Sequence, residues 1–333
     1  MVLENGKITN LMQPKIRSIA GDASFRKFYR FTSNNSSKII ALAEKEKYKN
    51  LIVYSTMNKF LRNNKIFTPR VFTQDYVKGI MIMEDFGDLT FYKILLETRN
   101  KLPVYKKLVD LLIKIQKVKP KKKLKTILTK SYVINKYSIK YLHQESDLFF
   151  DWYLPLFFSQ KKVLYMKSKI KKILSKLYMK LNFPNSHFVH RDYHVSNLMK
   201  VGRKIGVIDS QDALIGNPAY DLVSLIDDVR IKTSTKLKNQ IYTYYLRKTS
   251  KIYRANPEKF LEDFNILSVQ RSLKIIGIFS RLFKRDKKYL YVKLIPYTWK
   301  LLEMRMKSKI FSELKKIIDK NISKKIRKKI INK

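Results

Sequence analysis

The chain has 333 residues, 45% of them hydrophobic, which is enough to bury the core of two domains of ordinary size. It contains no cysteine, and this excludes disulfides, cysteine-ligated zinc and a thiol nucleophile. The formal net charge of +46 comes from lysines spread along the whole chain and not from one cluster, so we do not expect nucleic acid as a partner.

The N-terminus, MVLENGKITNLMQPK, lacks the charged and apolar regions of a signal peptide. The run of ~18 uninterrupted apolar residues that marks a transmembrane helix does not occur in the sequence. We therefore expect a cytoplasmic protein. No feature of the sequence indicates an obligate protein partner.

The first part of the chain predicts a small sheet with one helix. Short apolar runs separated by turn residues predict strands at 16–31 and 38–43, with Gly21 and Asp22 at a hairpin tip. A helix is expected at 46–63, followed by the strand pair PRVFTQDY and GIMIMED. The short acidic segment EDFGD, residues 84–88, then joins this sheet to the rest.

The remainder of the chain is predominantly helical by pattern. We predict helices at 89–99, 103–117 and 132–159, a solvated lysine-rich loop at 119–125, short strands at 187–190 and 198–208, and helices from 219 onward. The sequence thus predicts an α+β protein with an N-terminal antiparallel sheet lobe at 1–83, a hinge at 84–88 and a larger, mainly helical lobe at 89–333, with a cleft between the lobes.

Three of the four histidines lie in the segment HFVHRDYHVSN, residues 187–197. Their spacing of three and four would place His187, His190 and His194 on one face of a helix, as in a zinc site. The segment follows Pro184 and contains Phe-Val, which favours an extended strand and separates these side chains. We therefore do not expect zinc here.

The same segment fits phosphoryl transfer better. This reaction needs an acid that orients and deprotonates a hydroxyl group, and oxygen ligands that hold Mg²⁺ against nucleotide phosphates. Asp192 and Asn197 are five residues apart in H-R-D-x-x-x-x-N, and Asp209 ends the apolar strand 205–208. A loop followed by a short hairpin would bring the three together, with Asp192 as the base and Asn197 and Asp209 as magnesium ligands.

The motif HRDYHVSN followed by GVID resembles the catalytic core of protein kinases and of the aminoglycoside phosphotransferase and choline kinase group. Only eleven residues separate Asp209 from Asp221 of PAYDL, which is too few for the activation segment of a protein kinase, so the small-molecule group is the better match. The resemblance implies a two-lobe protein-kinase-like fold with ATP as co-substrate. It also implies that His190, Arg191 and Asp221 support the catalytic loop.

Several segments together resemble the kinases that phosphorylate the anomeric hydroxyl of N-acetylmuramate and N-acetylglucosamine. They are, in chain order, AGDASFRKFYRF, IMEDFGDLT, HQESDLFFDWYL, HRDYHVSNLM, GVIDSQDALIGNPAYDLVSLIDDVR and QRSLKIIGIFSRL. The similarity spans roughly residues 16–300. It implies an amino-sugar substrate and a role in peptidoglycan recycling.

The resemblance assigns nucleotide-binding residues to the sheet lobe. GDASFR corresponds to the nucleotide loop, where Gly21 permits a tight turn and the amides of Asp22, Ala23 and Ser24 face phosphate oxygens. Arg26 is the candidate for the phosphate-binding charge, because the expected strand lysine is missing from the middle of KIIALAEK. In the hinge, the backbone groups of Glu84, Asp85 and Phe86 would recognise adenine.

The sugar site is assigned in two ways. Gln211 and Asp212 directly follow the proposed metal ligand and are therefore placed for the acceptor side of the cleft. Glu145, Trp152 and Arg271 are candidates from the family resemblance alone. One departure is Ser210, where the group usually carries an aromatic residue after the metal-binding aspartate.

Residues 310–333 form a lysine-rich segment with apolar residues at helical spacing. This pattern predicts a basic terminal helix, which is compatible with an anionic membrane surface. Packing of the helix on the lobe is the favoured alternative.

The sequence therefore predicts a Mg²⁺-dependent, ATP-using kinase whose substrate is a small sugar. Two alternatives stay open: a kinase for another small alcohol, such as choline or an aminoglycoside, and a non-catalytic basic binding protein with a kinase-like fold.

Overall fold

A computed structural model describes residues 3–4, 7–8, 15–19, 26–33, 36–43, 48–126 and 130–330. The chain forms two compact units, which we call the sheet unit and the helical unit. The sheet unit comprises Met1–Phe91, Lys122–Val133 and Asn197–Asp212. The helical unit comprises Tyr92–Lys121, Ile134–Ser196 and Ala213–Lys333. The segments Lys122–Val133 and Asn197–Asp212 therefore belong to the sheet unit, although they follow residue 89, where the sequence predicted the helical lobe to begin.

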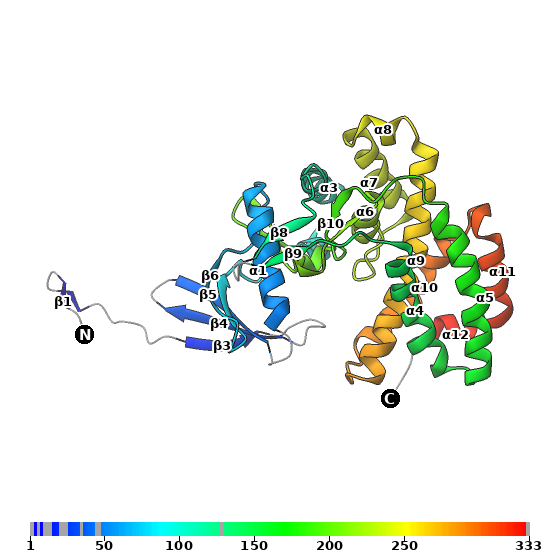
Figure 1. Cartoon of the computed structure of the whole chain (residues 1–333), viewed down its shortest axis with the longest axis horizontal. Helices are drawn as coiled ribbons and strands as arrows, with labels where there is room; N and C mark the ends of the chain where they lie inside the picture. Colours follow the sequence, from blue (N-terminus) through cyan, green and yellow to red (C-terminus); the bar gives the residue numbers. More distant parts are fainter. Residues whose placement is uncertain are drawn as a thin grey trace. The chain divides into compact units, whose positions relative to one another are not determined.

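The sheet unit is built on a five-stranded antiparallel sheet of order β3-β4-β5-β7-β6 (Figure 1). Its strands are β3 (Lys15–Ile19), β4 (Lys27–Ser33), β5 (Ser36–Leu42), β6 (Val71–Asp75) and β7 (Ile80–Glu84). Helix α1 (Tyr48–Asn63) connects β5 to β6. The described residues also form four two-stranded antiparallel sheets. These pair β1 (Leu3–Glu4) with β2 (Lys7–Ile8), β8 (Lys123–Lys125) with β9 (Ser131–Val133), β10 (His187–Val189) with β13 (Leu214–Gly216), and β11 (Leu198–Val201) with β12 (Lys204–Val207).

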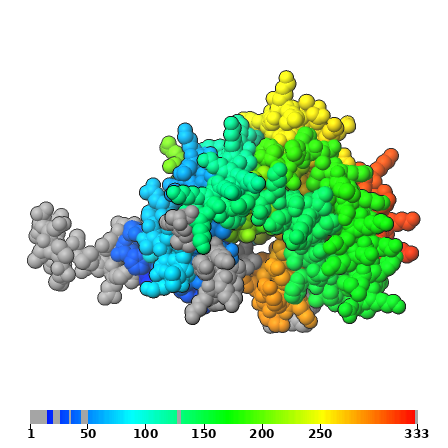
Figure 2. Space-filling view, viewed as in Figure 1, coloured from blue at the N-terminus to red at the C-terminus, as the bar shows by residue number. Residues whose placement is uncertain are grey.

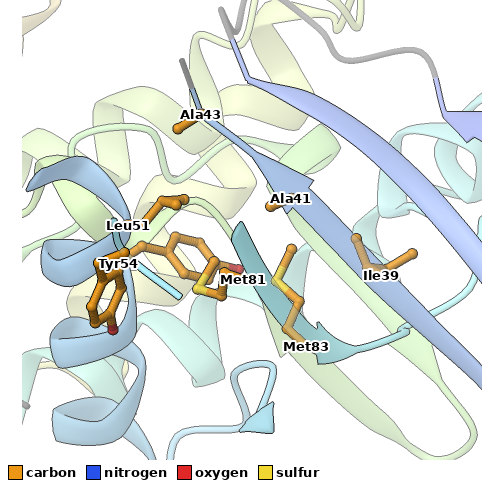
Figure 3. Packing of buried hydrophobic residues seen from close by; sticks show 8 residues of the cluster. Ile39, Ala41, Ala43, Leu51, Tyr54, Met81 and Met83 are labelled. Carbon is orange, nitrogen blue, oxygen red and sulfur yellow. The ribbon is translucent and has the colours of Figure 1, made fainter. Parts of the chain in front are cut away.

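One face of this sheet packs against α1. Alternate residues of a strand point to the same face, and on β5 these are Ile39 and Ala41, continued by Ala43. They meet Met81 and Met83 of β7 and Leu51 and Tyr54 of α1 in one buried cluster (Figure 3). This core fixes the position of α1, which carries Asn58, against the sheet.

The helical unit is organised around the long helix α9 (Pro257–Lys284), against which α4 and α10 pack (Figure 1). Its other helices are α2 (Phe91–Glu97), α3 (Leu102–Gln116), α4 (Ile139–Leu148), α5 (Gln160–Met179), α6 (Ala219–Ile226), α7 (Thr235–Lys248), α8 (Lys251–Arg254), α10 (Ile295–Arg305), α11 (Ser312–Asn321) and α12 (Lys324–Lys328). Gly277 allows α9 to approach the end of α4 closely, because a Cβ atom there would lie 2.3 Å from the carbonyl carbon of Leu148.

The predicted α+β class, with an N-terminal antiparallel sheet and a mainly helical second part, is confirmed. Two local predictions were wrong, and one strand was missed. The lysine-rich segment 119–125 contains β8 instead of being only a loop, and the helix predicted at 132–159 is replaced by β9, α4, a π-helical turn at Phe149–Tyr153 and a short 3-10 turn. Strand β13 was not predicted. Strands of three residues are too short to show a period in the sequence.

The C-terminal segment is divided, whereas the sequence predicted one basic helix at 310–333. It forms α11 and α12 with a break at Ile322 and Ser323. Leu314, Ile318 and Ile322 are fully buried, and α11 packs on α5. Figure 2 shows these C-terminal residues in red at the edge of the helical unit, beside the green of α5. The apolar face that Leu314, Ile318 and Ile322 form is therefore covered by protein, whereas Ile330 is exposed. No helix among the described residues is long and apolar enough to cross a bilayer.

Candidate active site

The residues predicted to act in phosphoryl transfer are divided between the two units. Asp192 belongs to the helical unit, and Asn197 and Asp209 belong to the sheet unit. The segment 187–189 is the extended strand β10, as predicted, and not part of a helix. Among the described residues, no group of three or more histidine, cysteine or acidic side chains could hold a metal ion.

The loop that carries Asp192 is held by Asp221. Oδ2 of Asp221 accepts a 2.7 Å hydrogen bond from the backbone amide of His190, and Oδ1 accepts a 3.0 Å bond from the amide of Arg191. Arg191 has a φ of 72°, a conformation that is unfavourable for a residue with a side chain. The two hydrogen bonds that the buried carboxylate of Asp221 accepts hold this strained turn in place. Burial raises the pKa of Asp221 to about 6.

Asp192 lies in an environment of positive charge within the helical unit. Burial alone would raise the pKa of its carboxyl group, but the charges of Lys274 and Arg271 outweigh burial and hold this pKa well below its usual range. Asp192 is therefore ionised across the neutral range. A carboxylate in this state accepts a hydrogen bond from a hydroxyl group and orients it, and it takes the proton only as the hydroxyl oxygen becomes bonded.

A buried ionic cluster around Glu145 supplies much of this charge. Glu145, on α4, accepts hydrogen bonds from Arg191 and Tyr137 and a 2.8 Å bond from the ammonium group of Lys274 on α9. Gln270 donates to the second carboxylate oxygen at 3.0 Å. Burial would raise the pKa of Glu145, but Lys274 and Arg191 lower it to about 2. Because protein donors occupy both oxygens, Glu145 holds Arg191 and Lys274 in place. A role of Glu145 in sugar binding stays a prediction.

Lys274, Gln270 and Tyr220 were not identified from the sequence, although Lys274 stands in the quoted motif QRSLK. A signal was present: Gln270, Arg271 and Lys274 are long polar residues in a mainly apolar stretch of α9, and Lys274 lies four and three residues after the other two, so that it shares a helix face with each. All three are buried. Polar side chains that a helix buries at such spacing need partners, and this requirement points to an internal polar site.

Asp209 is the centre of the polar contacts in the sheet unit. It has a φ of 66°, and its Oδ1 accepts hydrogen bonds from Arg26 at 3.1 Å and from Gln211 at 2.9 Å. Asn197 lies at the start of the hairpin β11–β12, and its carbonyl accepts a 3.1 Å bond from the amide of Ile208. The hairpin therefore brings Asn197 close to the residue that precedes Asp209. A carboxylate and an amide oxygen are donors of the kind that Mg²⁺ prefers.

Ser210 has a polar partner in place of the usual aromatic packing. Its hydroxyl is fully buried and donates a 2.9 Å hydrogen bond to Oδ1 of Asn58 on α1. The amide of Asn58 donates to the carbonyl of Pro69 at 3.1 Å. This chain of bonds ties the turn that contains Asp209 to α1.

The structure describes only some of the residues that were predicted to bind the nucleotide. Gly21, Asp22, Ala23 and Ser24 lie outside the described residues. Arg26 is buried, pairs with Asp209, and lies with its guanidinium 5.7 Å and 5.8 Å from the ring centres of Phe28 and Tyr54.

The hinge residues make internal contacts. The backbone amide of Glu84 donates to the carbonyl of Arg70 at 2.8 Å, the carboxylate of Asp85 pairs with Arg30, and Phe86 stacks on Phe67 with ring centres 4.6 Å apart. The amide of Glu84 is thus occupied within the sheet. Recognition of adenine by the backbone of these residues stays a prediction.

The remaining sugar candidates are differently placed. Gln211 donates to Asp209 and, at 3.3 Å, to the exposed Asp212. Trp152 is half-buried in the π-helical turn after α4. Arg271 is buried, and its Nε donates a 2.8 Å bond to Ser224. None of these contacts tests a role in sugar binding.

Comparisons with known proteins agree with this geometry. Residues 15–255 match the model of the phosphotransferase enzyme family. The chain is 28% identical over 284 residues to an N-acetylmuramate/N-acetylglucosamine kinase of Neisseria meningitidis, with 83% of this chain and 81% of the relative covered. It is 29% identical over 287 residues to the kinase of the same description from Pseudomonas aeruginosa, with 85% and 81% covered.

Among solved structures, the ADP-bound aminoglycoside phosphotransferase APH(2'')-Ib matches with a TM-score of 0.56 at 14% identity, covering 87% of this chain and 92% of that one. This likeness supports the kinase-like fold. The family match extends over most of the chain and confirms the resemblance seen in the sequence, and it removes the alternative of a non-catalytic binding protein. The chain belongs to the phosphotransferase enzyme family and is a small-molecule kinase.

Proposed function

We propose that this kinase transfers the γ-phosphoryl group of ATP to the anomeric hydroxyl of an amino sugar, N-acetylmuramate or N-acetylglucosamine. The observation that carries the proposal is the half-buried Asp192, kept ionised by Lys274 and Arg271. The names of the relatives from Neisseria and Pseudomonas support the choice of sugar. Because ATP is the co-substrate, we place the reaction in the cytoplasm.

An ionised aspartate with a low pKa is a weak base, and this favours an acidic hydroxyl as its partner. The anomeric hydroxyl is more acidic than an ordinary alcohol because the ring oxygen withdraws electrons from C1. Asp192 then orients this hydroxyl toward the phosphorus and accepts its proton late, as the new O–P bond forms and the bond from phosphorus to ADP breaks.

In this proposal Asn197 and Asp209 hold Mg²⁺. When bound, the ion neutralises charge on the nucleotide phosphates and on the leaving ADP. Arg26, already paired with Asp209, adds positive charge on the nucleotide side. Asp221 acts through the loop by holding the amides of His190 and Arg191, so that Asp192 points in one direction.

The test is turnover of ATP, with and without Mg²⁺, on a panel of acceptors. N-acetylmuramate and N-acetylglucosamine should be phosphorylated, and phosphorus NMR of the product should show a sugar 1-phosphate. The 1-O-methyl glycoside of N-acetylglucosamine should be inert, because it lacks the hydroxyl that attacks. A 6-phosphate product, or rapid phosphorylation of the methyl glycoside, would refute the anomeric assignment while leaving the kinase intact.

Choline and aminoglycosides serve as the competing acceptors in the same panel. Both are cationic, and the positive charges of Lys274 and Arg271 beside Asp192 would repel them. We expect poor turnover with both. Preference for either over the amino sugars would instead identify the protein as a kinase for another small alcohol.

A further inference from the structure

Arg271 is a buried cation with most of its hydrogen-bonding capacity unused. Its side chain projects from α9, and the residue is only 5% exposed. Its Nε donates to the hydroxyl of Ser224 at 2.8 Å, and this is the one hydrogen bond from Arg271 to any described residue. A guanidinium has five N–H donors in a planar fork. The two outer nitrogens, Nη1 and Nη2, therefore have no acceptor among the described residues.

Its neighbours on the same face of the unit are paired. Lys274, one helical turn further along α9, donates to Glu145 at 2.8 Å and to the hydroxyl of Tyr220 at 3.3 Å. Arg191 also pairs with Glu145. By contrast, no described carboxylate lies within salt-bridge distance of Arg271, the third cation that acts on Asp192. Asp192, Asp228 and Glu145 act on Arg271 through their charges, but none of them forms a salt bridge with it among the described contacts. A buried guanidinium whose outer N–H groups lack an acceptor is costly, because those groups have been removed from water.

We propose that Nη1 and Nη2 of Arg271 bind a carboxylate of the sugar acceptor, so that the protein prefers N-acetylmuramate, which carries a lactyl carboxylate, to the neutral N-acetylglucosamine. The proposal rests on the proposed function, because it adds to it the group that distinguishes the two sugars. The planar fork of a guanidinium matches a carboxylate in a two-point contact. The charge of Arg271 acts on Asp192, the residue proposed to orient the acceptor hydroxyl, so we assign Arg271 to the acceptor side of the reaction.

The transferred phosphoryl group is the other anion that could meet Arg271. In the proposed function, the charge of the phosphoryl group is neutralised by Arg26 and by Mg²⁺ held on Asn197 and Asp209. We therefore assign Arg271 to the acceptor. The two sources are separable by experiment, because every acceptor receives the same phosphoryl group, whereas only N-acetylmuramate brings a carboxylate.

The first arm uses the unaltered protein and compares N-acetylmuramate with its carboxamide, in which the carboxylate is replaced by a neutral group of the same shape. We expect kcat/KM for the acid to exceed that for the amide about ten- to a hundred-fold, the effect of one charged two-point contact. This arm requires no variant, so it decides the question even if Arg271→Gln does not fold. Equal kcat/KM for the two sugars would overturn the proposal.

The second arm compares Arg271→Gln with Arg281→Gln, a matched change on the same helix. In Arg271→Gln the preference for acid over amide should disappear, whereas in Arg281→Gln it should persist. If Arg271→Gln lowered kcat/KM equally for the acid, the amide and N-acetylglucosamine, Arg271 would serve the phosphoryl group and the proposal would be wrong. If the unaltered protein phosphorylated none of these sugars, the proposed function itself would fail, and the assignment of Arg271 with it.

Discussion

Arg26 donates a 3.1 Å hydrogen bond to Oδ1 of Asp209, and the two residues are 183 positions apart in the chain. The arginine is buried with its guanidinium near the rings of Phe28 and Tyr54. The sheet unit thus joins the residue proposed to hold Mg²⁺ to the residue proposed to meet the nucleotide phosphates. The two proposed roles, metal binding by Asp209 and phosphate binding by Arg26, can be distinguished by measuring ATP binding with and without Mg²⁺.

Asp209→Ala should weaken binding of ATP only when Mg²⁺ is present, because its carboxylate acts through the metal. Arg26→Gln should weaken binding of ATP both with Mg²⁺ and with a chelator, because its charge acts on the phosphates directly. Calorimetry of ATP binding in the two conditions measures both effects. Asn197→Ala should resemble Asp209→Ala with a smaller loss, since it removes a neutral ligand. Unchanged affinity for MgATP in Asp209→Ala would exclude it as the metal ligand.

Asp192→Asn should reduce kcat by about a hundred- to ten-thousand-fold, the usual effect of removing a group that accepts the proton in the transition state. Affinity for MgATP should stay within about three-fold, since ΔΔG below roughly 1 kcal/mol is expected for a group that does not bind nucleotide. The control is Asp75→Asn, which changes an exposed carboxylate at the end of β6. Near-native turnover in Asp192→Asn would remove Asp192 from the mechanism.

Glu145→Gln should destabilise the protein at neutral pH by about 3–5 kcal/mol, because it leaves Lys274 and Arg191 without their buried anion. The folded state lowers the pKa of Glu145 to about 2. The stabilisation is therefore fully present above the unfolded pKa of about 4.3 and is lost as the pH falls through the folded value. Chemical denaturation at several pH values should show the difference from the unaltered protein shrinking between about pH 5 and pH 2.

The double variant Glu145→Leu with Lys274→Met provides the check on this interpretation. Removing both charges eliminates the uncompensated ion, so the loss should be smaller than the sum of the two single losses. Simple additivity of the two changes would indicate that Glu145 and Lys274 do not stabilise each other.

Ile318→Ala should lower the free energy of unfolding by about 2–4 kcal/mol, because Ile318 is fully buried in α11 and its truncation leaves a cavity. The matched control is Ile330→Ala, at a position that is 48% exposed, which should change stability by less than about 0.5 kcal/mol. Thermal or denaturant unfolding measures both.

The same pair of variants tests whether the C-terminal segment binds membranes. Vesicles containing anionic lipid should not retain the protein by an apolar insertion of this segment, since Leu314, Ile318 and Ile322 are covered by protein. Retention that resisted high salt and fell in Ile318→Ala without unfolding would contradict the packing of α11 on α5.

The sequence by itself determined the class of fold, the family and the order of the chemistry-bearing motifs. These were readable because they are local: alternation in β5 and β7, the helical period of α9, and the fixed spacing of Asp192, Asn197 and Asp209. Strands of three residues, such as β13, carry too little periodicity to be found in this way. The spacing of the motifs, however, says nothing about which unit each residue joins.

Only the tertiary structure decided which charged side chains contact each other. Glu145 and Lys274 are 129 residues apart, and their contact exists because Gly277 lets α9 approach α4 closely. The pairing of Arg26 with Asp209 and the bond of Ser210 to Asn58 likewise join distant segments. Such pairs arise because buried polar groups must find partners among whatever side chains the packing brings within reach. The same packing leaves Arg271 with one hydrogen-bond partner among the described residues, and no pattern in the sequence distinguishes it from Lys274, which bonds to both Glu145 and Tyr220.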